Sequence, residues 1–289
     1  MNYTIKSETL QVSVSDLGAE LASLKKDGCE YLWQGNPEYW KGRAPVLFPI
    51  CGRLFEGKYT YQGKTYEMIL HGFSKISTYK MAKQTENAVS FLLESNEETK
   101  KQYPFDFALT VEYAVNGNTL TVTGTMENKG KEILPAAYGG HPGFNVPLDN
   151  GSFEDWYLEF SEECSPDRLQ FSDRCLNTGK KQAFPLTNGK TLPLAHSLFA
   201  KDAIFLSRMS SAVTLKSDKS QRSVTVSYPD MPYLGFWHKP DSDAPYVCIE
   251  PWCGLPAFDG ETDDFAVKND MFRIPVGSSK TVVYQITLR

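Results

Sequence analysis

Apolar and polar residues alternate with a period of two in many short segments of this 289-residue chain, and this pattern limits its possible folds more than any other feature. In the clearest segment, residues 107–115 place their apolar side chains on one face of a strand, and residues 120–126 predict a second strand. Asn116-Gly117 between them is a favoured pair for a type I′ turn. The segment therefore predicts an antiparallel hairpin.

Further segments show the same alternation. A second hairpin is predicted from residues 59–61 and 64–68, because Gly63 between them can take the positive φ of a tight turn. Strands are also predicted at residues 10–14, 224–228 and 282–288. Many short strands separated by Gly, Pro and Asn turns are typical of a large antiparallel sandwich.

Helical signals are few. Asn-Pro-Glu at residues 36–38 offers an N-cap, a proline at the first helical position and an acid in the first turn, which predicts a short helix through Trp40. Residues 97–102 predict one more helical turn. We therefore predict an all-β fold, a large antiparallel β-sandwich with few short helices. No linker or shift in composition marks a boundary, so residues 1–289 are predicted to form a single domain.

Composition and charge exclude several classes of partner. The chain has 30 Lys and Arg against 35 Asp and Glu, whereas a nucleic-acid-binding protein normally shows a basic excess. The N-terminus does not resemble a secretory signal, and the longest apolar stretch, near residues 44–51, contains two prolines and is far shorter than the ~20 residues of a membrane span. Six cysteines without a Cys-x-x-Cys pair are most simply free thiols. We therefore predict a soluble, cytoplasmic protein with no nucleic-acid or membrane partner.

Two of the four histidines lie in unusual surroundings. His141 lies in the sequence Gly-Gly-His-Pro-Gly-Phe, where glycines allow a ligand to approach closely and Pro142 stiffens the backbone. This setting suits an imidazole that acts on a small molecule, and the alternative is a turn histidine that bonds a backbone carbonyl. His71 follows the predicted strand that begins at Lys64, and taken alone it is better explained as a half-exposed residue at a strand end.

Glu250 is the strongest candidate among the carboxylates. It ends an apolar run and precedes Pro251 and Trp252, so it is expected to be partly buried, and burial raises a carboxyl pKa toward the range of a general base. The alternative is a core glutamate in a salt bridge with Arg53 or Arg43. Trp252 suits a sugar, whose C–H faces stack on aromatic rings.

Two further residues complete the candidate set. Arg53 follows a rigid apolar passage and a glycine, a setting that can present a fixed guanidinium group to a ligand. Asp202 is a weaker candidate that could equally cap a turn. The chain contains no Walker A, GxSxG or HExxH sequence, and no GxGxxG between a strand and a helix, so nucleotide-driven, serine-hydrolase and zincin chemistries are not indicated.

Four short motifs in family-like order and separation give the chain a wider resemblance. They are Gly-Arg-Leu at residues 52–54, His-Gly-Phe at 71–73, Gly-His-Pro-Gly-Phe at 140–144 and Glu-Pro-Trp at 250–252. Together they resemble the aldose 1-epimerase (galactose mutarotase) family, and residues 17–21 and 43–49 are similar to its LacX-like branch. The resemblance implies the galactose mutarotase-like supersandwich, with a sugar bound in a cleft on a concave face.

The resemblance also implies roles for the candidate residues. Glu250 matches the general base of the family and His141 its general acid. His71 matches a histidine that contacts the ring oxygen or neighbouring hydroxyls, Arg53 matches an arginine that fixes sugar hydroxyls, and Asp202 is similar to a substrate-binding aspartate. The implied reaction opens the C1–O5 bond of an aldohexose and closes the ring from the other face, which requires no cofactor and no metal. A monomer or a homodimer is expected.

One departure from the family concerns phosphate. Members that act on hexose 6-phosphates often carry Ala-Arg after His-Gly-Phe, whereas this chain has Ser74-Lys75. Lysine keeps the positive charge but lacks the bidentate fork of arginine, and the net charge of −5 repels a dianion. We therefore predict turnover of a free aldose at least as efficient as that of its 6-phosphate, with a hexose-6-phosphate mutarotase as the alternative.

Three other kinds of site remain open at this point. A glycosidase needs two carboxylates ~5–9.5 Å apart, which Glu250 and Asp202 could supply, but the histidines would then lack a role. A metal site of His71, His141 and Glu250 has no close ligand spacing in its favour. The main alternative is a non-catalytic sugar-binding protein on the same fold, although binding alone needs no acid–base pair.

Overall fold

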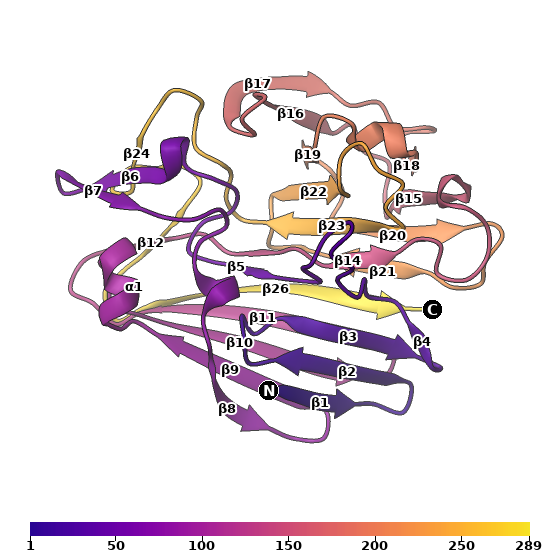
Figure 1. Ribbon diagram of the computed structural model, residues 1–289, viewed down its shortest axis with the longest axis horizontal. Helices are drawn as coiled ribbons and strands as arrows, with labels where there is room; N and C mark the ends of the chain where they lie inside the picture. Colours follow the sequence, from indigo (N-terminus) through magenta and orange to yellow (C-terminus); the bar gives the residue numbers. More distant parts are fainter.

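The computed structural model describes residues 1–289, which form two large antiparallel sheets and three smaller ones (Figure 1). The predicted all-β sandwich is confirmed. The nine-stranded sheet has the order β18 (Thr191–Pro193), β15 (Trp156–Phe160), β20 (Ala212–Ser217), β21 (Val224–Ser227), β26 (Ser279–Leu288), β11 (Thr119–Asn128), β10 (Phe107–Asn116), β9 (Ala88–Glu94) and β8 (Lys80–Gln84).

The eight-stranded sheet carries most of the residues of interest. Its order is β17 (Asn177–Ala183), β16 (Asp167–Phe171), β19 (Ile204–Ser207), β22 (Tyr233–Trp237), β23 (Tyr246–Trp252), β13 (Gly139–Gly140) and β5 (Val46–Leu47), with β14 (Gly143–Asn145) also paired to β23. In Figure 1, β22 and β23 lie above the long strands β26 and β11 of the nine-stranded sheet.

The remaining elements are short. A four-stranded sheet contains β1 (Asn2–Lys6), β2 (Leu10–Ser15), β3 (Leu21–Lys26) and β4 (Cys29–Glu30). The other two sheets pair β12 (Leu134–Ala136) with β25 (Phe272–Ile274), and β6 (Lys58–Tyr61) with β7 (Lys64–Glu67) and β24 (Asp263–Asp264). The helical elements are α1 (Glu97–Gln102) and the 3₁₀ turns η1 (Phe55–Gly57), η2 (Ser74–Ile76), η3 (Phe153–Asp155) and η4 (His196–Phe199).

Both predicted hairpins form, but one turn differs from the prediction. β10 and β11 pair from Phe107 opposite Asn128 to Asn116 opposite Thr119, so the loop is Gly117-Asn118. Only Gly117 in this loop has a positive φ, whereas a type I′ turn needs two such residues, so the Asn116-Gly117 turn was wrong by one residue. The β6–β7 hairpin turns through Gln62 (φ 48°) and Gly63 (φ 74°), as expected. The strands predicted at residues 10–14, 224–228 and 282–288 are β2, β21 and β26.

The helix predicted through residues 97–102 is confirmed, and the one predicted through Trp40 is wrong. The Asn96 side chain caps α1 by accepting hydrogen bonds from the amides of its first turn. At residues 36–40 the amides of Tyr39 and Trp40 both donate to the carbonyl of Asn36, which gives a single turn. No backbone hydrogen bond from Lys41 continues this turn into a helix, and the carbonyl of Trp40 accepts from the indole of Trp33 (2.8 Å).

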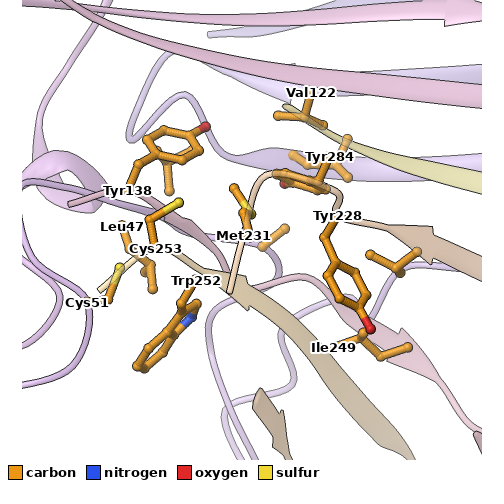
Figure 2. Close-up of a cluster of buried hydrophobic side chains, with 14 of the residues drawn as sticks. Leu47, Cys51, Val122, Tyr138, Tyr228, Met231, Ile249, Trp252, Cys253 and Tyr284 are labelled. Atoms are coloured by element: carbon orange, nitrogen blue, oxygen red, sulfur yellow. The ribbon is translucent and has the colours of Figure 1, made fainter. Parts of the chain in front are cut away.

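One continuous core joins the two large sheets and the smaller ones. It contains 73 buried side chains, among them Ile249 of β23, Val122 of β11 and Tyr284 of β26, which Figure 2 shows close together with Tyr228 and Met231. This continuous core supports the single domain over residues 1–289, which stays a prediction. No helix is long or apolar enough for a membrane crossing.

Strand β23 is buried on both faces, and this explains its unusual sequence. All seven of its residues are buried. Side chains alternate across a strand, so Val247 and Ile249 lie on one face, within the core, while Cys248, Glu250 and Trp252 lie on the other, where Trp252 also packs with core residues. A charged residue can therefore stand within an apolar run because its side chain faces a cavity rather than the core.

Candidate active site

A cavity of about 510 Å³ opens beside β22 and β23, and it gathers every residue selected from the sequence. The residues that line it include Arg53, His71, His141, Asp202, Glu250 and Trp252. These residues are far apart in the chain, and the eight-stranded sheet and the loops around it bring them to one place. This is the size of cavity that holds small molecules in other proteins.

The backbone on both sides of the catalytic candidates is fixed by hydrogen bonds to β23. His141 lies in the short connection between β13 and β14, both of which pair with β23. Within this connection the carbonyl of Pro142 accepts a hydrogen bond from the amide of Ile249 (3.0 Å), the residue before Glu250. His141 and Glu250 are therefore held opposite each other by the sheet rather than by a flexible loop.

His141 and Glu250 form a buried pair. Nε2 of His141 lies 3.2 Å from Oε2 of Glu250, and the two side chains are only 10% and 2% exposed. Trp40 stacks on the His141 imidazole at 5.0 Å between ring centroids. The salt bridge considered for Glu250 with Arg53 or Arg43 is absent, and the partner of Glu250 is His141.

Burial changes the proton affinities of the pair in opposite directions. Desolvation lowers the pKa of His141 to about 3, because the charged imidazolium loses its hydration. Desolvation also raises the pKa of Glu250 well above its ordinary value, and the negative charge of Asp202 adds to this effect. Burial therefore favours a neutral carboxylic acid beside a neutral imidazole, with Oε2 of Glu250 3.2 Å from Nε2 of His141.

His71 occupies a turn rather than a strand end. β7 ends at Glu67, and His71 has a positive φ of 65°. Its Nδ1 accepts a hydrogen bond from the amide of Gly52 (3.0 Å), so in the neutral ring the proton lies on Nε2, which remains available as a donor. Burial lowers the pKa of His71 well below its ordinary value, with smaller contributions from His141 and the nearby cations.

Gly72 is required by the close contact between this turn and the segment that precedes Arg53. It has φ +71°, and a Cβ at this position would overlap the backbone carbonyl of Phe48. Gly72→Ala is expected to lower the free energy of unfolding by about 3 kcal/mol, because an alanine at this position suffers both backbone strain and steric overlap. Gly63→Ala is the matched control, because Gly63 has φ +74° but no heavy atom within 4 Å of the place a Cβ would take, and a loss of only about 1 kcal/mol is expected. Urea unfolding measures both; equal losses would contradict the contact.

Asp202 lies just after η4 and also lines the cavity. Its Oδ1 accepts from the indole Nε1 of Trp237 (2.7 Å), and its Oδ2 accepts from the thiol of Cys175 (2.8 Å). Asp202 itself has φ 83°, which is rare for a residue with a side chain. Its carboxylate is therefore held in one orientation, and the turn cap considered from the sequence is not its role.

Sequence reasoning missed three cavity residues of chemical interest: Trp40, Cys175 and Trp237. Trp237 had a signal, because it lies in Gly-Phe-Trp-His at the end of a strand. Trp252, selected for sugar stacking, is only 3% exposed and packs on Phe205 at 4.2 Å. Trp40 and Trp237 expose more of their rings, so they offer the better stacking surfaces.

Donor atoms for a metal also occur here. Those of His141, Cys248 and Glu250 lie within 4.8 Å of one another, a set that differs from the His71, His141 and Glu250 set considered from the sequence. His141 and Glu250 already face each other as a buried acid–base pair 3.2 Å apart, so this set carries no proposal for a metal.

The paired sheets and the polar, aromatic-walled cavity beside β23 define the mutarotase-like class of β-sandwich proteins. The chain belongs to the aldose 1-epimerase family, because the family model described as Aldose 1-epimerase matches residues 1–258. The resemblance inferred from the four motifs is thereby confirmed.

Relatives that match along the whole chain agree with this assignment. The chromosomal protein LacX of Lactococcus lactis subsp. lactis is 36% identical over 300 residues, which cover 100% of this chain and 99% of LacX. A galactose mutarotase related enzyme from Lactobacillus acidophilus is 36% identical with a TM-score of 0.95, covering 100% of this chain and 97% of that one. A galactose mutarotase-like protein from Lactobacillus casei ATCC 334 is 31% identical with a TM-score of 0.94, covering both chains completely.

Proposed function

We propose that the protein is an aldose 1-epimerase that interconverts the α and β anomers of an aldohexose by general acid–base catalysis. The observation that carries the proposal is the buried contact of 3.2 Å between His141 and Glu250 in a cavity of sugar-binding size. Mutarotation needs one group that takes a proton from O1 and one that gives a proton to O5. Membership of the aldose 1-epimerase family supports the same reaction class.

The pair can perform this exchange with a single proton. In the working form, Glu250 is a carboxylate and His141 an imidazolium, which is reached by transfer of the one proton of the pair from Oε2 of Glu250 to Nε2 of His141, 3.2 Å away. Glu250 takes the O1 proton, His141 protonates O5, and the C1–O5 bond breaks to leave an aldehyde. The pair is then neutral, which is the form that burial favours. Rotation about C1–C2 and the reverse transfers close the ring from the other face.

The other cavity residues bind and orient the sugar in this proposal. His71 donates from Nε2, because its Nδ1 is occupied by the amide of Gly52. Arg53 donates to hydroxyls, and Asp202 accepts from them. The rings of Trp40 and Trp237 pack on the C–H faces of the sugar.

The direct test is mutarotation itself. We expect the purified protein to accelerate the conversion of α-glucose or α-galactose in a polarimeter, with an unchanged rate in EDTA, because the proposed steps use only protein side chains and the sugar. The buffer rate is subtracted. If no aldose in the panel reacts faster than in buffer while sugars bind, the non-catalytic sugar-binding protein is the correct alternative. Loss of activity in EDTA would favour a metal site.

A sugar 6-phosphate is a second candidate substrate, because Lys75 lines the cavity without a carboxylate partner. Lys75 is half-buried, and desolvation alone lowers its pKa. An unpaired cation in such a place can bind an anion. The Lys75 side chain nevertheless supplies one flexible charge and no fork, so it binds phosphate less specifically than an arginine pair does.

We expect kcat/KM for free glucose or galactose to be at least equal to that for the 6-phosphate. Lys75→Ala is expected to change the value for the free sugar less than about threefold, because the proposed chemistry does not involve Lys75. Coupled assays on the four sugars measure this comparison. A strong preference for the phosphate that disappears in Lys75→Ala would instead make Lys75 the phosphate anchor and the protein a hexose-6-phosphate mutarotase.

A further inference from the structure

The carboxylate of Asp202 is held by two side chains that come from different parts of the chain. Trp237 ends β22 and donates from its indole to Oδ1 (2.7 Å), and Cys175 lies between β16 and β17 and donates from its thiol to Oδ2 (2.8 Å). All three residues line the cavity. In the proposed function Trp237 contributes only the face of its ring, and Cys175 has no role.

Backbone strain occurs at both ends of the thiol–carboxylate contact. Cys175 has φ 57° and Asp202 has φ 83°, although neither is a glycine. Such conformations cost of order 1 kcal/mol or more each and concentrate at functional sites. Cys175 is fixed in a tight turn, because its amide donates to the carbonyl of Ser172 (2.8 Å) and the amide of Ser172 donates to the carbonyl of Leu176 (2.8 Å). The fold therefore keeps two strained residues in contact.

The chemistry of the contact shows which atom donates. An ionised carboxylate only accepts hydrogen bonds, so the thiol and the indole must both be donors. Burial, followed by the hydrogen bond to Asp202, raises the pKa of Cys175 to about 11, so the thiol keeps its proton near neutral pH. Each carboxylate oxygen has two lone-pair sites, so one site on each remains free for the cavity.

We infer that Cys175 and Trp237 are positioning residues that orient the Asp202 carboxylate to accept hydrogen bonds from sugar hydroxyls. The inference rests on the proposed function, which gives Asp202 its role in binding the sugar. It extends that function by naming the residues that determine which hydroxyls Asp202 can bind. With both oxygens anchored, the carboxylate cannot rotate to follow a different hydroxyl. The arrangement therefore makes the site sensitive to the position and configuration of one or two hydroxyls.

The test uses sugar affinity as well as turnover. Cys175→Ala removes the donor and is expected to raise the Kd and KM of the preferred aldose about 3- to 10-fold, with a smaller change in kcat. Cys175→Ser keeps a donor and is expected to recover most of this loss. Cys29→Ala is the control, because Cys29 is also half-buried but does not line the cavity, and no change is expected. Calorimetry gives Kd without requiring turnover.

A double-mutant cycle separates positioning from packing. In an Asp202→Ala background, Cys175→Ala should have no further effect on Kd, because its donor acts only through Asp202. A panel of deoxy sugars provides a second cycle, since the sugar that lacks the hydroxyl read by Asp202 should be insensitive to Cys175→Ala. Trp237→Phe removes the indole N–H and also changes the stacking ring. The part of its effect on Kd that comes from the lost N–H is expected to disappear in the Asp202→Ala background.

The outcomes separate this inference from the proposed reaction. Additive effects of Cys175→Ala and Asp202→Ala, or failure of Cys175→Ser to recover affinity, would overturn the positioning role even if the protein is an active mutarotase. A coupled cycle in Kd without any mutarotation would support the positioning role and contradict the proposed reaction. If no aldose in the panel binds, both are contradicted.

Discussion

Glu250→Gln is expected to reduce kcat for mutarotation by about 10²- to 10⁴-fold, while Kd for the sugar changes less than about threefold. Glutamine keeps the shape of the side chain and can still contact His141 at the observed distance of 3.2 Å. It cannot take the O1 proton, so the transfer that begins ring opening is lost. Stopped-flow or polarimetric rates measure kcat, and calorimetry measures Kd.

His141→Asn is the matched variant from the other side of the pair, and it should cause a comparable loss. Because the two residues exchange one proton and act as a unit, the double variant is expected to be about as slow as either single variant. A glutamine variant with a near-normal rate would show that Glu250 only stabilises the fold through His141.

Thermal unfolding provides the folding control for Glu250→Gln. Burial raises the pKa of Glu250 above its value in the unfolded chain. Above about pH 4.5 the carboxyl therefore ionises in the unfolded chain but not in the folded one, which stabilises the unfolded chain. This residue therefore stabilises the fold less as the pH rises, and glutamine removes that dependence. At pH 7 we expect the Tm of Glu250→Gln to be equal to or above that of the wild type. Such a Tm would show that the loss of turnover does not come from unfolding.

Local patterns were sufficient to predict the strands, because the period of alternation is a property of a few consecutive residues. The hairpin of β10 and β11 follows from side chains within twenty residues, and its register differs from the prediction only at the turn. The turn could not be predicted as reliably, because an asparagine lies on each side of Gly117. Both Asn116-Gly117 and Gly117-Asn118 are therefore suitable turn pairs.

The membership of the candidate site was predictable where a residue lies in a distinctive short motif. His71, His141 and Glu250 each stand beside glycine or proline, which is a signal that sequence can carry. Cys175 and Trp40 have no such signal, because their places in the cavity depend on long-range packing. The same holds for the contact of Asp202 with Trp237, which joins residues 35 positions apart.

Charge states required the structure. A sequence predicts that Glu and His near neutral pH provide a carboxylate and an imidazolium, using their ordinary pKa values. Only the three-dimensional arrangement reveals that both groups are buried against each other, with Trp40 over the imidazole. The predicted roles of acid and base are kept in the proposal, but the resting form of the pair becomes neutral.

The pH profile of kcat/KM is the second prediction with a large expected effect. Catalysis in the proposed mechanism needs the pair to hold one proton. Because burial keeps Glu250 protonated, the second proton that inactivates the pair must enter at His141. With an ordinary histidine pKa of 6.5, kcat/KM would fall tenfold per pH unit below that value and be about 100-fold lower near pH 4.5.

Burial lowers the pKa of His141 to about 3, so the acid limb is expected near that value. We therefore expect kcat/KM to stay constant within about twofold from pH 6.5 down to about pH 4.5. The same shift makes the fold less stable as the pH falls from 6.5 toward 3, because the unfolded chain takes up a proton that buried His141 refuses. Circular dichroism at each pH separates this loss of folded protein from a loss of catalysis.

Trp40→Ala tests the cause of the shift. The Trp40 ring covers His141 at 5.0 Å between centroids, and its removal admits water to the imidazole. Hydration favours the charged form, so the pKa of His141 should rise toward 6.5 and the acid limb should move upward with it. The comparison uses kcat/KM normalised to its plateau, because Trp40→Ala also weakens sugar stacking. A wild-type acid limb already near pH 6.5 would mean that His141 is hydrated in the working enzyme. A Trp40→Ala profile identical to that of the wild type would mean that burial by Trp40 does not determine the proton affinity of His141.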